Sequence, residues 1–430
     1  MSECCGGKKP KEIKTTDPCC PPEPECSETK KIVSTSGSCE SANASSKNAI
    51  DCPLTWFKDM IPHCLEYAKA KKAEGKKIVG IMCEYTPREI IMAADAVPVC
   101  LCGGSQKTIS AAEEDLPANL CPLIKSTYGY LKQKSNPFLE MADLIVAETT
   151  CDGKKKMYEL MGASKPVHIL ELPQKPDSPD AMNHWIQEIR KLKSTLEERF
   201  GVQITDCKLK ESIGVMNKER ALRRQLAELM KADIPPMTGR ELLDLKSSIS
   251  GIPCDFKQYE KALQMLPGRK PFKDIESRVR VLMTGVPMVH GAERVIEIIE
   301  QHGGIVVAQE NCTGIKPVIE DVKLNGKDPM TAIAEKYFHL PCSVMTKNND
   351  RMDLLRCLAK EYRAQCIIEL VWQACLTYDV ESFWVKSLAE KEIGIPYLHI
   401  ETDYSPSDSA RIAVRVEALF ETIKSRIASR

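Results

Sequence analysis

The sequence lacks the features that would mark a membrane, secreted or nucleic-acid-binding protein. No apolar run approaches the length of a membrane span, and the N-terminus lacks the apolar core of a secretory signal. Lysine and arginine together number 60, as do aspartate and glutamate, so net charge gives no reason to expect a nucleic acid or an anionic membrane as partner. We therefore expect a cytoplasmic protein.

Cysteine, in contrast, is abundant, with 20 in 430 residues. A reducing cytosol argues against a disulfide framework, so we expect metal, redox or catalytic roles for some of these thiols. Five of them lie in helical or apolar contexts, where a buried thiol behaves as a small hydrophobe. These five are Cys64, Cys207, Cys254, Cys357 and Cys366.

Residues 1–50 differ in composition from the rest of the chain. They are rich in Ser, Lys, Glu and Pro, and they hold too little apolar surface to offset the entropy of ordering them. We expect a disordered, cysteine-rich tail. Its cysteine spacing matches no zinc or iron–sulfur pattern, so no ligand is assigned there.

Residues 51–180 alternate between short apolar runs and helical patterns. An amphipathic helix is expected over Leu54–Ala73, and another begins near Pro87 with Thr86 as its cap. Four runs have the length and composition of buried strands: Lys77–Met82, Val97–Leu101, Leu144–Ala147 and Val167–Leu170. This alternation predicts a doubly wound α/β domain.

The turn after Leu144–Ala147 carries the first chemical signal. Cys151 lies between this strand and a helical pattern, at the carboxyl edge of the sheet, where α/β proteins bind ligands. Lys154, Lys155 and Lys156 place positive charge beside the thiol, which favours the metal-binding thiolate. Cys151 is therefore a candidate metal ligand.

The middle of the chain offers no chemistry of its own. Residues 181–275 are dominated by charged amphipathic segments, including Met182–Phe200 and Leu209–Lys231. We predict a helical bridge whose charge runs are solvated helix faces.

Residues 276–430 repeat the order of residues 51–180. The first strand of each part is KIVGIM and RVLMTGVP, and the second is AVPVCLCGG and IVVAQENCTG. Further along, NLCPLIK matches HLPCSVM, and DLIVAETTCDGKKKMYEL matches CIIELVWQACLTYDVESFWV. We therefore predict two doubly wound, Rossmann- or flavodoxin-like α/β domains, related by internal duplication and facing each other across a cleft. Three cysteine pairs recur: Cys102 with Cys312, Cys121 with Cys342, and Cys151 with Cys375.

Six converging thiolates select iron–sulfur clusters, zinc or copper(I). Zinc sites usually show tight C-x-x-C pairs. Here neighbouring candidates within each domain are roughly twenty to thirty residues apart, which requires a preformed scaffold and favours a large cluster held between the domains.

Several motifs resemble a known family. They are CEYTPREI, NLCPLIKSTYGY, ETTCDGKKKMYEL, ENCTGIKP, WQACLTYDVES and GIPYLHIETDYS, from about residue 78 to 405. They are similar to the 2-hydroxyacyl-CoA dehydratase and benzoyl-CoA reductase superfamily, and within it they most resemble the double-cubane cluster proteins.

The resemblance implies the ligands. Dehydratase subunits bind one [4Fe–4S] cluster through three cysteines, which match Cys121, Cys151 and Cys375. Double-cubane proteins hold an [8Fe–9S] cluster through six cysteines, which adds Cys312, Cys342 and one more. The duplication favours Cys102 as the sixth. Cys83, at a strand end before a helix, is nearly as good, so both stay open.

The resemblance also implies partners and a reaction. A separate homodimeric activator, which hydrolyses ATP and carries its own [4Fe–4S] cluster, supplies low-potential electrons. The chain itself is expected to be a homodimeric oxidoreductase that reduces small unsaturated or N–N/N–O-bonded molecules. Two alternatives remain: a 2-hydroxyacyl-CoA dehydratase subunit with one [4Fe–4S] cluster, and an iron–sulfur carrier or storage protein.

A reduction also needs protons and a tuned cluster. The candidate proton donors are His290 and His339, together with Glu84, Glu310 and Glu148, which lie near predicted strand ends. The alternatives are a loop position for His339 and a capping role for Glu310. Lysines near the cluster would either hydrogen-bond its sulfides or face solvent, and these are Lys125 and Lys154–Lys156. Glu401 and Asp403, after the last strand, are expected in packing or an interface rather than in an ion pair across the cleft.

Overall fold

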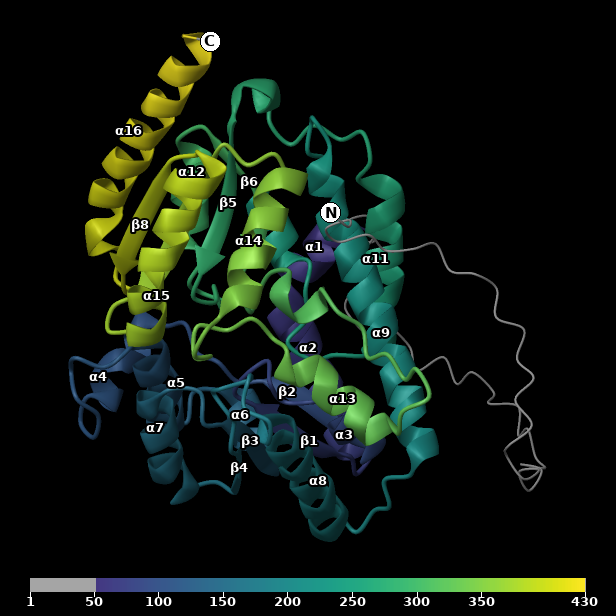
Figure 1. Cartoon of the computed structure of the whole chain (residues 1–430). Helices are drawn as coiled ribbons and strands as arrows, with labels where there is room; N and C mark the ends of the chain where they lie inside the picture. Colours follow the sequence, from purple (N-terminus) through teal and green to yellow (C-terminus); the bar gives the residue numbers. More distant parts are fainter. Residues whose placement is uncertain (1–51, 430) are drawn as a thin grey trace, which may run out of the picture. The chain divides into compact units, whose positions relative to one another are not determined.

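Two parallel sheets of four strands each form the framework of the protein. The computed structural model describes residues 52–429, so the predicted tail in residues 1–50 lies outside the described residues. Within the described chain, no helix combines the length and apolar character needed to cross a membrane. Figure 1 shows β1 to β4 in the lower part of the view and β5, β6 and β8 in the upper part.

The first sheet has the strand order β2-β1-β3-β4, with every neighbouring pair parallel. Alternate residues of its central strands enter different cores. Ile78 and Ile145 pack toward helices of residues 60–73, 137–141 and 152–162, whereas Val79 and Val146 pack toward helices of residues 88–93 and 181–200. The strands are β1 (Lys77–Ile81), β2 (Ala96–Cys100), β3 (Leu144–Glu148) and β4 (Val167–Leu170).

The second sheet repeats this topology in the order β6-β5-β7-β8, again all parallel. Helices cover both of its faces as well. The prediction of two doubly wound α/β halves is therefore confirmed. The strands are β5 (Val279–Gly285), β6 (Gly304–Glu310), β7 (Cys366–Trp372) and β8 (Tyr397–Thr402).

Helices surround both sheets. Those before residue 180 are α1 (Pro53–Lys58), α2 (Met60–Ala73), α3 (Arg88–Ala93), α4 (Ile109–Ala112), α5 (Pro122–Gln133), α6 (Pro137–Met141) and α7 (Asp152–Gly162). The middle segment holds α8 (Ala181–Phe200), α9 (Asp206–Glu228), α10 (Gly239–Asp244) and α11 (Pro253–Met265). The last are α12 (Arg294–Gln301), α13 (Pro329–Phe338), α14 (Asn349–Glu361), α15 (Leu376–Ser387) and α16 (Ser409–Ala428).

Two local predictions need correction. The single helix expected over Leu54–Ala73 is broken at Asp59, which separates α1 from α2. Pro87 precedes α3 as its N-cap residue, and Thr86 does not cap the helix, because its hydroxyl donates to Glu148 instead. The hydroxyl of Thr86, predicted to cap the helix, thus hydrogen-bonds to the buried carboxylate of Glu148 instead.

The middle segment is helical, as the sequence predicts, and it joins the two halves. Helix α9 packs against α3 of the first half and α13 of the second. There Arg220 of α9 donates to Glu89 at 2.5 Å and to the hydroxyl of Tyr337 at 3.1 Å, and Tyr337 donates to Glu89 at 2.8 Å. The predicted domain boundaries, at 51–180, 181–275 and 276–430, stay predictions.

Candidate functional site

A large cavity lies where strand ends of the two halves meet. Its volume is about 1400 Å³. Six cysteines line it, three from each half, together with lysine, threonine and apolar side chains. These six are Cys83, Cys121, Cys151, Cys312, Cys342 and Cys375. We call this space the cysteine cavity.

Three of the cavity cysteines stand at the starts of helices. Cys121 is the N-cap residue of α5, Cys151 of α7 and Cys375 of α15. The N–H groups at the start of each helix therefore lie beside the cysteine that precedes it, an arrangement that suits a negatively charged group. Ala374 has a φ of 58°, and this left-handed turn brings the chain from β7 into Cys375.

The other three cavity cysteines follow a strand or a helix. Cys83 comes shortly after β1, Cys312 comes shortly after β6, and Cys342 lies in the loop after α13. Gly285, at the end of β5, has a φ of 109°, and a Cβ there would lie 2.0 Å from the carbonyl oxygen of Leu370. Only glycine therefore lets β5 turn toward the cavity at this point.

Electrostatic interactions divide the six thiols into two groups. In the first group, a hydrogen bond from Cys375 lowers the pKa of Cys121, while the same bond, together with burial, raises the pKa of Cys375. Burial raises the pKa of Cys151, and the charge of Cys121 adds to this effect. Cys121, Cys151 and Cys375 therefore form one triad.

The second triad contains Cys83, Cys312 and Cys342. Burial raises the pKa of Cys83 well above its usual value, and the charges of Cys312 and Cys342 add to this effect. Burial likewise raises the pKa of Cys312 to about 12, and the charge of Cys342 contributes. Because Cys342 also raises the pKa of Cys151, the two triads adjoin.

The donor set fits a cluster better than a single ion. Within residues 52–429, no three His, Cys, Asp or Glu side chains are arranged to hold one metal ion. The six thiols are instead distributed around a wide space, and they would become thiolate ligands once metal replaces their protons. Thiolates in this number suit an iron–sulfur cluster.

Cys102 lies outside the wall of the cysteine cavity. Its Sγ donates to the carbonyl oxygen of Met82 at 3.4 Å, and the residue lines a smaller pocket. Burial raises the pKa of Cys102 to about 11. The structure thus brings Cys83, rather than Cys102, together with the other five cysteines.

The predicted lysines have different surroundings. Lys154 lines the cysteine cavity, and its Nζ donates to the carbonyl oxygen of Met82 at 2.7 Å. Lys155 and Lys156 pair with acidic neighbours on the exposed face of their own helix. Lys125 is held away from the cavity, because its Nζ donates to Glu113 at 2.7 Å. Lys154 is the member of this set best placed to act on a cluster.

Three of the predicted proton donors do not line the cysteine cavity. His290 has a side chain that is 57% exposed, with its Nδ1 3.6 Å from Glu293. His339 is exposed and lines a different surface pocket. Glu84 forms two hydrogen bonds of 2.9 Å with Arg88, whose charge holds the pKa of this buried carboxyl below its usual value.

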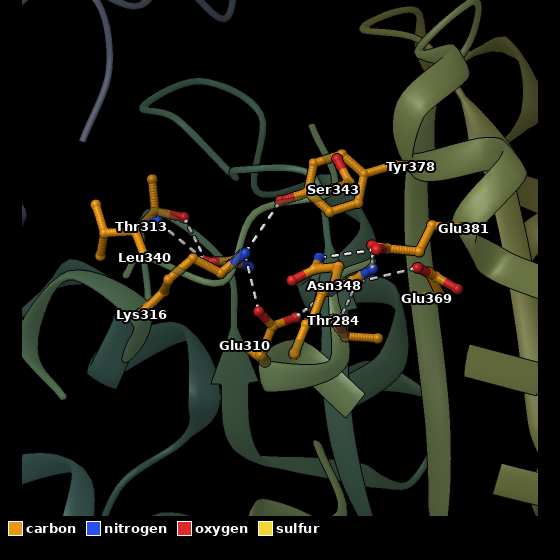
Figure 2. A network of polar contacts seen from close by, with 12 residues as sticks. Thr284, Glu310, Thr313, Lys316, Leu340, Ser343, Asn348, Glu369, Tyr378 and Glu381 are labelled. Carbon is orange, nitrogen blue, oxygen red and sulfur yellow. Dashed lines mark hydrogen bonds and ion pairs between the residues drawn. The ribbon is translucent and has the colours of Figure 1, made fainter. Parts of the chain in front are cut away.

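Glu310 belongs to a buried ionic network, shown in Figure 2. Burial alone would raise its pKa, but Lys316 at 2.9 Å and Arg351 at 3.1 Å hold it below the usual value. Arg351 also donates to Glu369 at 3.1 Å. An ionised carboxylate paired in this way has no proton to donate, so its role here is to fix the two cations.

Glu148, at the end of β3, has the protonation behaviour of an acid–base group. It is fully buried, its Oε1 accepts the hydroxyl of Thr86, and its Oε2 has no hydrogen-bond partner among the described residues. Burial raises the pKa of Glu148 to about 7. Its charge also acts on Cys83. Of the five predicted donors, Glu148 is therefore the one whose proton is available near neutral pH beside a cavity cysteine.

Two side chains near the cavity were missed by the sequence analysis. Lys316, four residues after Cys312, is fully buried, and its charge counteracts the effect of burial on the Cys312 pKa. Its Nζ lies 3.2 Å from the hydroxyl of Tyr378, which lines the cavity (Figure 2). The duplication contained a signal for Tyr378, because it follows Cys375 by three residues just as Lys154 follows Cys151.

The last strand carries no cavity residue. Glu401 is exposed, and Asp403 accepts the N–H of Ser405 at 2.7 Å. The packing or interface role expected for this stretch therefore stays a prediction.

Comparisons with known proteins point to one family. The model described as HGD-D, 2-hydroxyglutaryl-CoA dehydratase, D-component, matches residues 83–423. An Escherichia coli (strain K12) protein named "Putative dehydratase subunit YjiM" is 39% identical over 82% of this chain and 93% of that protein. The (R)-phenyllactyl-CoA dehydratase beta subunit of Clostridium sporogenes is 26% identical over 85% of this chain and 97% of that protein. A benzoyl-CoA reductase subunit of Thauera aromatica is 24% identical over 64% of this chain and 72% of that protein.

Proposed function

Because the chain belongs to the 2-hydroxyglutaryl-CoA dehydratase D-component family, we propose that it is an iron–sulfur reductase that holds an [8Fe–9S] double-cubane cluster. Members of this family typically contain iron–sulfur clusters. The six cysteines of the cysteine cavity would be the ligands, with Cys83 in place of Cys102. The double-cubane type is our inference from the cysteines of this chain.

The observation that carries this proposal is the pair of adjoining triads. A single [4Fe–4S] cluster held by Cys121, Cys151 and Cys375 would leave three more thiols of the same cavity without a purpose. Cys342 is buried, Cys83 and Cys312 are partly buried, and the three thiols act electrostatically on one another. Two linked cubanes would use both triads, and each triad draws ligands from both halves of the chain.

The chain's own residues would prepare the site for electrons. When bound, the cluster supplies low-potential electrons to a small unsaturated or N–N/N–O-bonded substrate. Lys154 and Lys316 place two positive charges near the cavity thiols, which stabilises a negatively charged group there. Glu148 would hold the proton that must accompany an electron, since its pKa is raised by burial to about 7.

The partners follow from the same proposal. We infer a separate ATP-hydrolysing homodimeric activator with its own [4Fe–4S] cluster as the electron donor, and a homodimeric, cytoplasmic state for this protein. A pull-down with candidate activators in the presence of ATP would test the first of these, and light scattering would test the second.

Iron and acid-labile sulfide analysis of anaerobically purified protein tests the proposal. We expect about eight irons and slightly more sulfide per chain. A value of about four irons would refute the double cubane. A cluster that moves readily to an apo-acceptor would instead identify an iron–sulfur carrier or storage protein.

A second candidate is a 2-hydroxyacyl-CoA dehydratase subunit with one [4Fe–4S] cluster. The observation in its favour is the identity of its relatives, because the Escherichia coli and Clostridium sporogenes proteins described above are both named as dehydratase subunits. It would use only Cys121, Cys151 and Cys375. About four irons per chain, together with water elimination from a 2-hydroxyacyl-CoA when a second subunit is added, would establish it.

A further inference from the structure

A second, smaller pocket adjoins the cysteine cavity. It has a volume of about 290 Å³ and lies between the halves. Its wall includes the end of β2, Arg223 of α9, four residues of the segment 246–250 and the loop before α12. Cys312 lines both this pocket and the cysteine cavity, so a molecule in the pocket would lie beside a proposed cluster ligand.

Positive charge exceeds negative charge in this pocket. Three cations line it, Arg88, Arg223 and Lys246, and one carboxylate, Glu84. Arg88 donates two hydrogen bonds of 2.9 Å to this carboxylate. The nearest ion-pair partner of Arg223 is Glu219, at 3.8 Å. Arg223 and Lys246 therefore form no close ion pair with an acid that lines the pocket.

Lys246 is the less compensated of the two. Its Nζ donates to the main-chain carbonyl of Leu243 at 2.7 Å, and it forms no ion pair with the described residues. Burial lowers its pKa to about 8, although the charges of Asp244 and Glu293 counteract this effect, so the ammonium is present at neutral pH and only partly stabilised. An anion would supply the missing charge.

Hydroxyl groups and tightly packed backbone complete the wall. Ser247, Ser248 and Ser250 line the pocket. A Cβ at Gly104 would lie 2.8 Å from the carbonyl oxygen of His290, so glycine is needed where the loops of the two halves meet. The pocket is thus polar and at the small end of the size range of ligand sites, too small for a coenzyme A thioester.

We infer that this pocket binds a small anion, an oxyanion or a carboxylate, between Arg223 and Lys246 and next to Cys312. Binding of the anion does not depend on the proposed function. Only the idea that the anion is then reduced rests on that function. Small oxyanions and carboxylates both carry a negative charge on two or three oxygens. These oxygens can accept hydrogen bonds from a guanidinium, an ammonium and serine hydroxyls.

Isothermal titration calorimetry on the anaerobically purified full-length protein, without reductant, tests the inference. The probes are nitrate for an oxyanion, acetate for a carboxylate, and acetamide as the neutral analogue of acetate. We expect at least one anion to bind and acetamide to bind about tenfold more weakly or not at all. In Lys246→Gln and Arg223→Gln the anion should bind about tenfold more weakly, as expected for a lost charge-assisted hydrogen bond.

Lys391→Gln is the matched control, because Lys391 is exposed and outside the pocket, and its anion affinity should equal that of the wild type. Three outcomes would overturn the inference: neither anion binds, acetamide binds as tightly as the tighter-binding anion, or anion affinity is unchanged in both pocket variants. Iron content is measured on the same samples. About eight irons without anion binding would refute the pocket alone, and about four irons with anion binding would refute the double cubane alone.

Discussion

Burial raises the pKa of both Cys83 and Cys102, and the charge of Lys154 counteracts this effect at both thiols. Only Cys83 of the two lines the cysteine cavity. We therefore expect Cys83→Ser to lose about half of the iron or all of it, as we expect for Cys312→Ala and Cys342→Ala. Cys102→Ser should retain the iron content of the wild type. Iron per chain, measured after anaerobic purification, checks this prediction.

Equal iron loss in Cys83→Ser and Cys102→Ser would contradict this ligand assignment, as would full iron in Cys312→Ala. A serine that merely prevented folding would also lower the yield of monodisperse protein. Circular dichroism of each variant separates that outcome from ligand loss.

The sequence could not choose between these two cysteines, for a physical reason. Duplication matches Cys102 with Cys312, because each follows the second strand of its half. The thiol of Cys102, however, donates to the carbonyl of Met82, whereas Cys312 lines the cavity. Alignment gives the position of a residue along a strand or turn, but the direction of its side chain depends on packing across the sheet.

Lys336 should make stability depend on pH. Burial, and then the charge of Arg220, lower its pKa to about 7, whereas a lysine in the unfolded chain titrates near 10.5. The unfolded state therefore binds more protons between these values, and the wild type gains stability as pH rises from about 7 toward 10. Lys336→Met removes this cost, so the variant should be the more stable at pH 7.

Thermal unfolding at pH 7, 8 and 9.5 measures this effect. The advantage of Lys336→Met over the wild type should shrink as pH rises, by up to about 1.4 kcal/mol per pH unit. A constant difference across this range would show that the ammonium is not destabilised by burial. Lys391→Met changes an exposed lysine and should show no such trend.

At the scale of elements, helix α5 is held close to its neighbour by a glycine. A Cβ at Gly129 would lie 1.9 Å from the carbonyl oxygen of Thr108. Gly129→Ala must therefore move α5, and we expect a loss of about 1–3 kcal/mol of unfolding free energy. Because α5 begins directly after Cys121, iron content should fall as well.

Gly214 provides the matched control for that substitution. It lies within α9, and a Cβ there would meet no atom within 4 Å. Gly214→Ala should stabilise the protein by up to about 1 kcal/mol, because alanine loses less backbone entropy in a helix. Urea unfolding of both variants tests the pair, and opposite signs are expected. Destabilisation by both would show that helix packing does not distinguish the two sites.

The elements themselves were largely predictable because their signals are local. The strand Val167–Leu170 has the predicted bounds, and β1 and β3 differ from prediction by one residue at their carboxyl ends. The failures have tertiary causes. Thr86 would cap α3 on local pattern alone, but the buried carboxylate of Glu148 takes its hydroxyl. No pattern within the helix itself reveals such a competitor.

At the scale of the whole molecule, the site depends on two halves meeting. The sequence could predict that cysteines at strand ends would face a cleft, since that follows from duplication and parallel sheets. The duplication grouped them by half, whereas the family resemblance already implied the set Cys121, Cys151 and Cys375. The structure groups these three together, and groups Cys312 and Cys342 with Cys83. Such grouping depends on how the halves pack, which strand and helix patterns do not contain.

The joint formed by Arg220, Glu89 and Tyr337 should therefore control the cavity as well as stability. Arg220→Leu leaves the buried carboxylate of Glu89 without its cation, so we expect a loss of about 3–5 kcal/mol. Tyr337→Phe removes one hydrogen bond to the same carboxylate and should cost about 1.5–3 kcal/mol.

The matched control for this joint is Arg356→Leu, because Arg356 pairs with Asp353 and Glu392 on the surface, where an ion pair contributes at most about 1 kcal/mol. Chemical denaturation gives the order of stabilities, and iron retention after dilution reports the cavity. Because the joint connects α9 to both halves, Arg220→Leu should release iron faster than Arg356→Leu does. Equal stability and equal iron retention in these two variants would mean that the halves are held together by apolar packing alone, and that the cysteine cavity does not depend on this ionic joint.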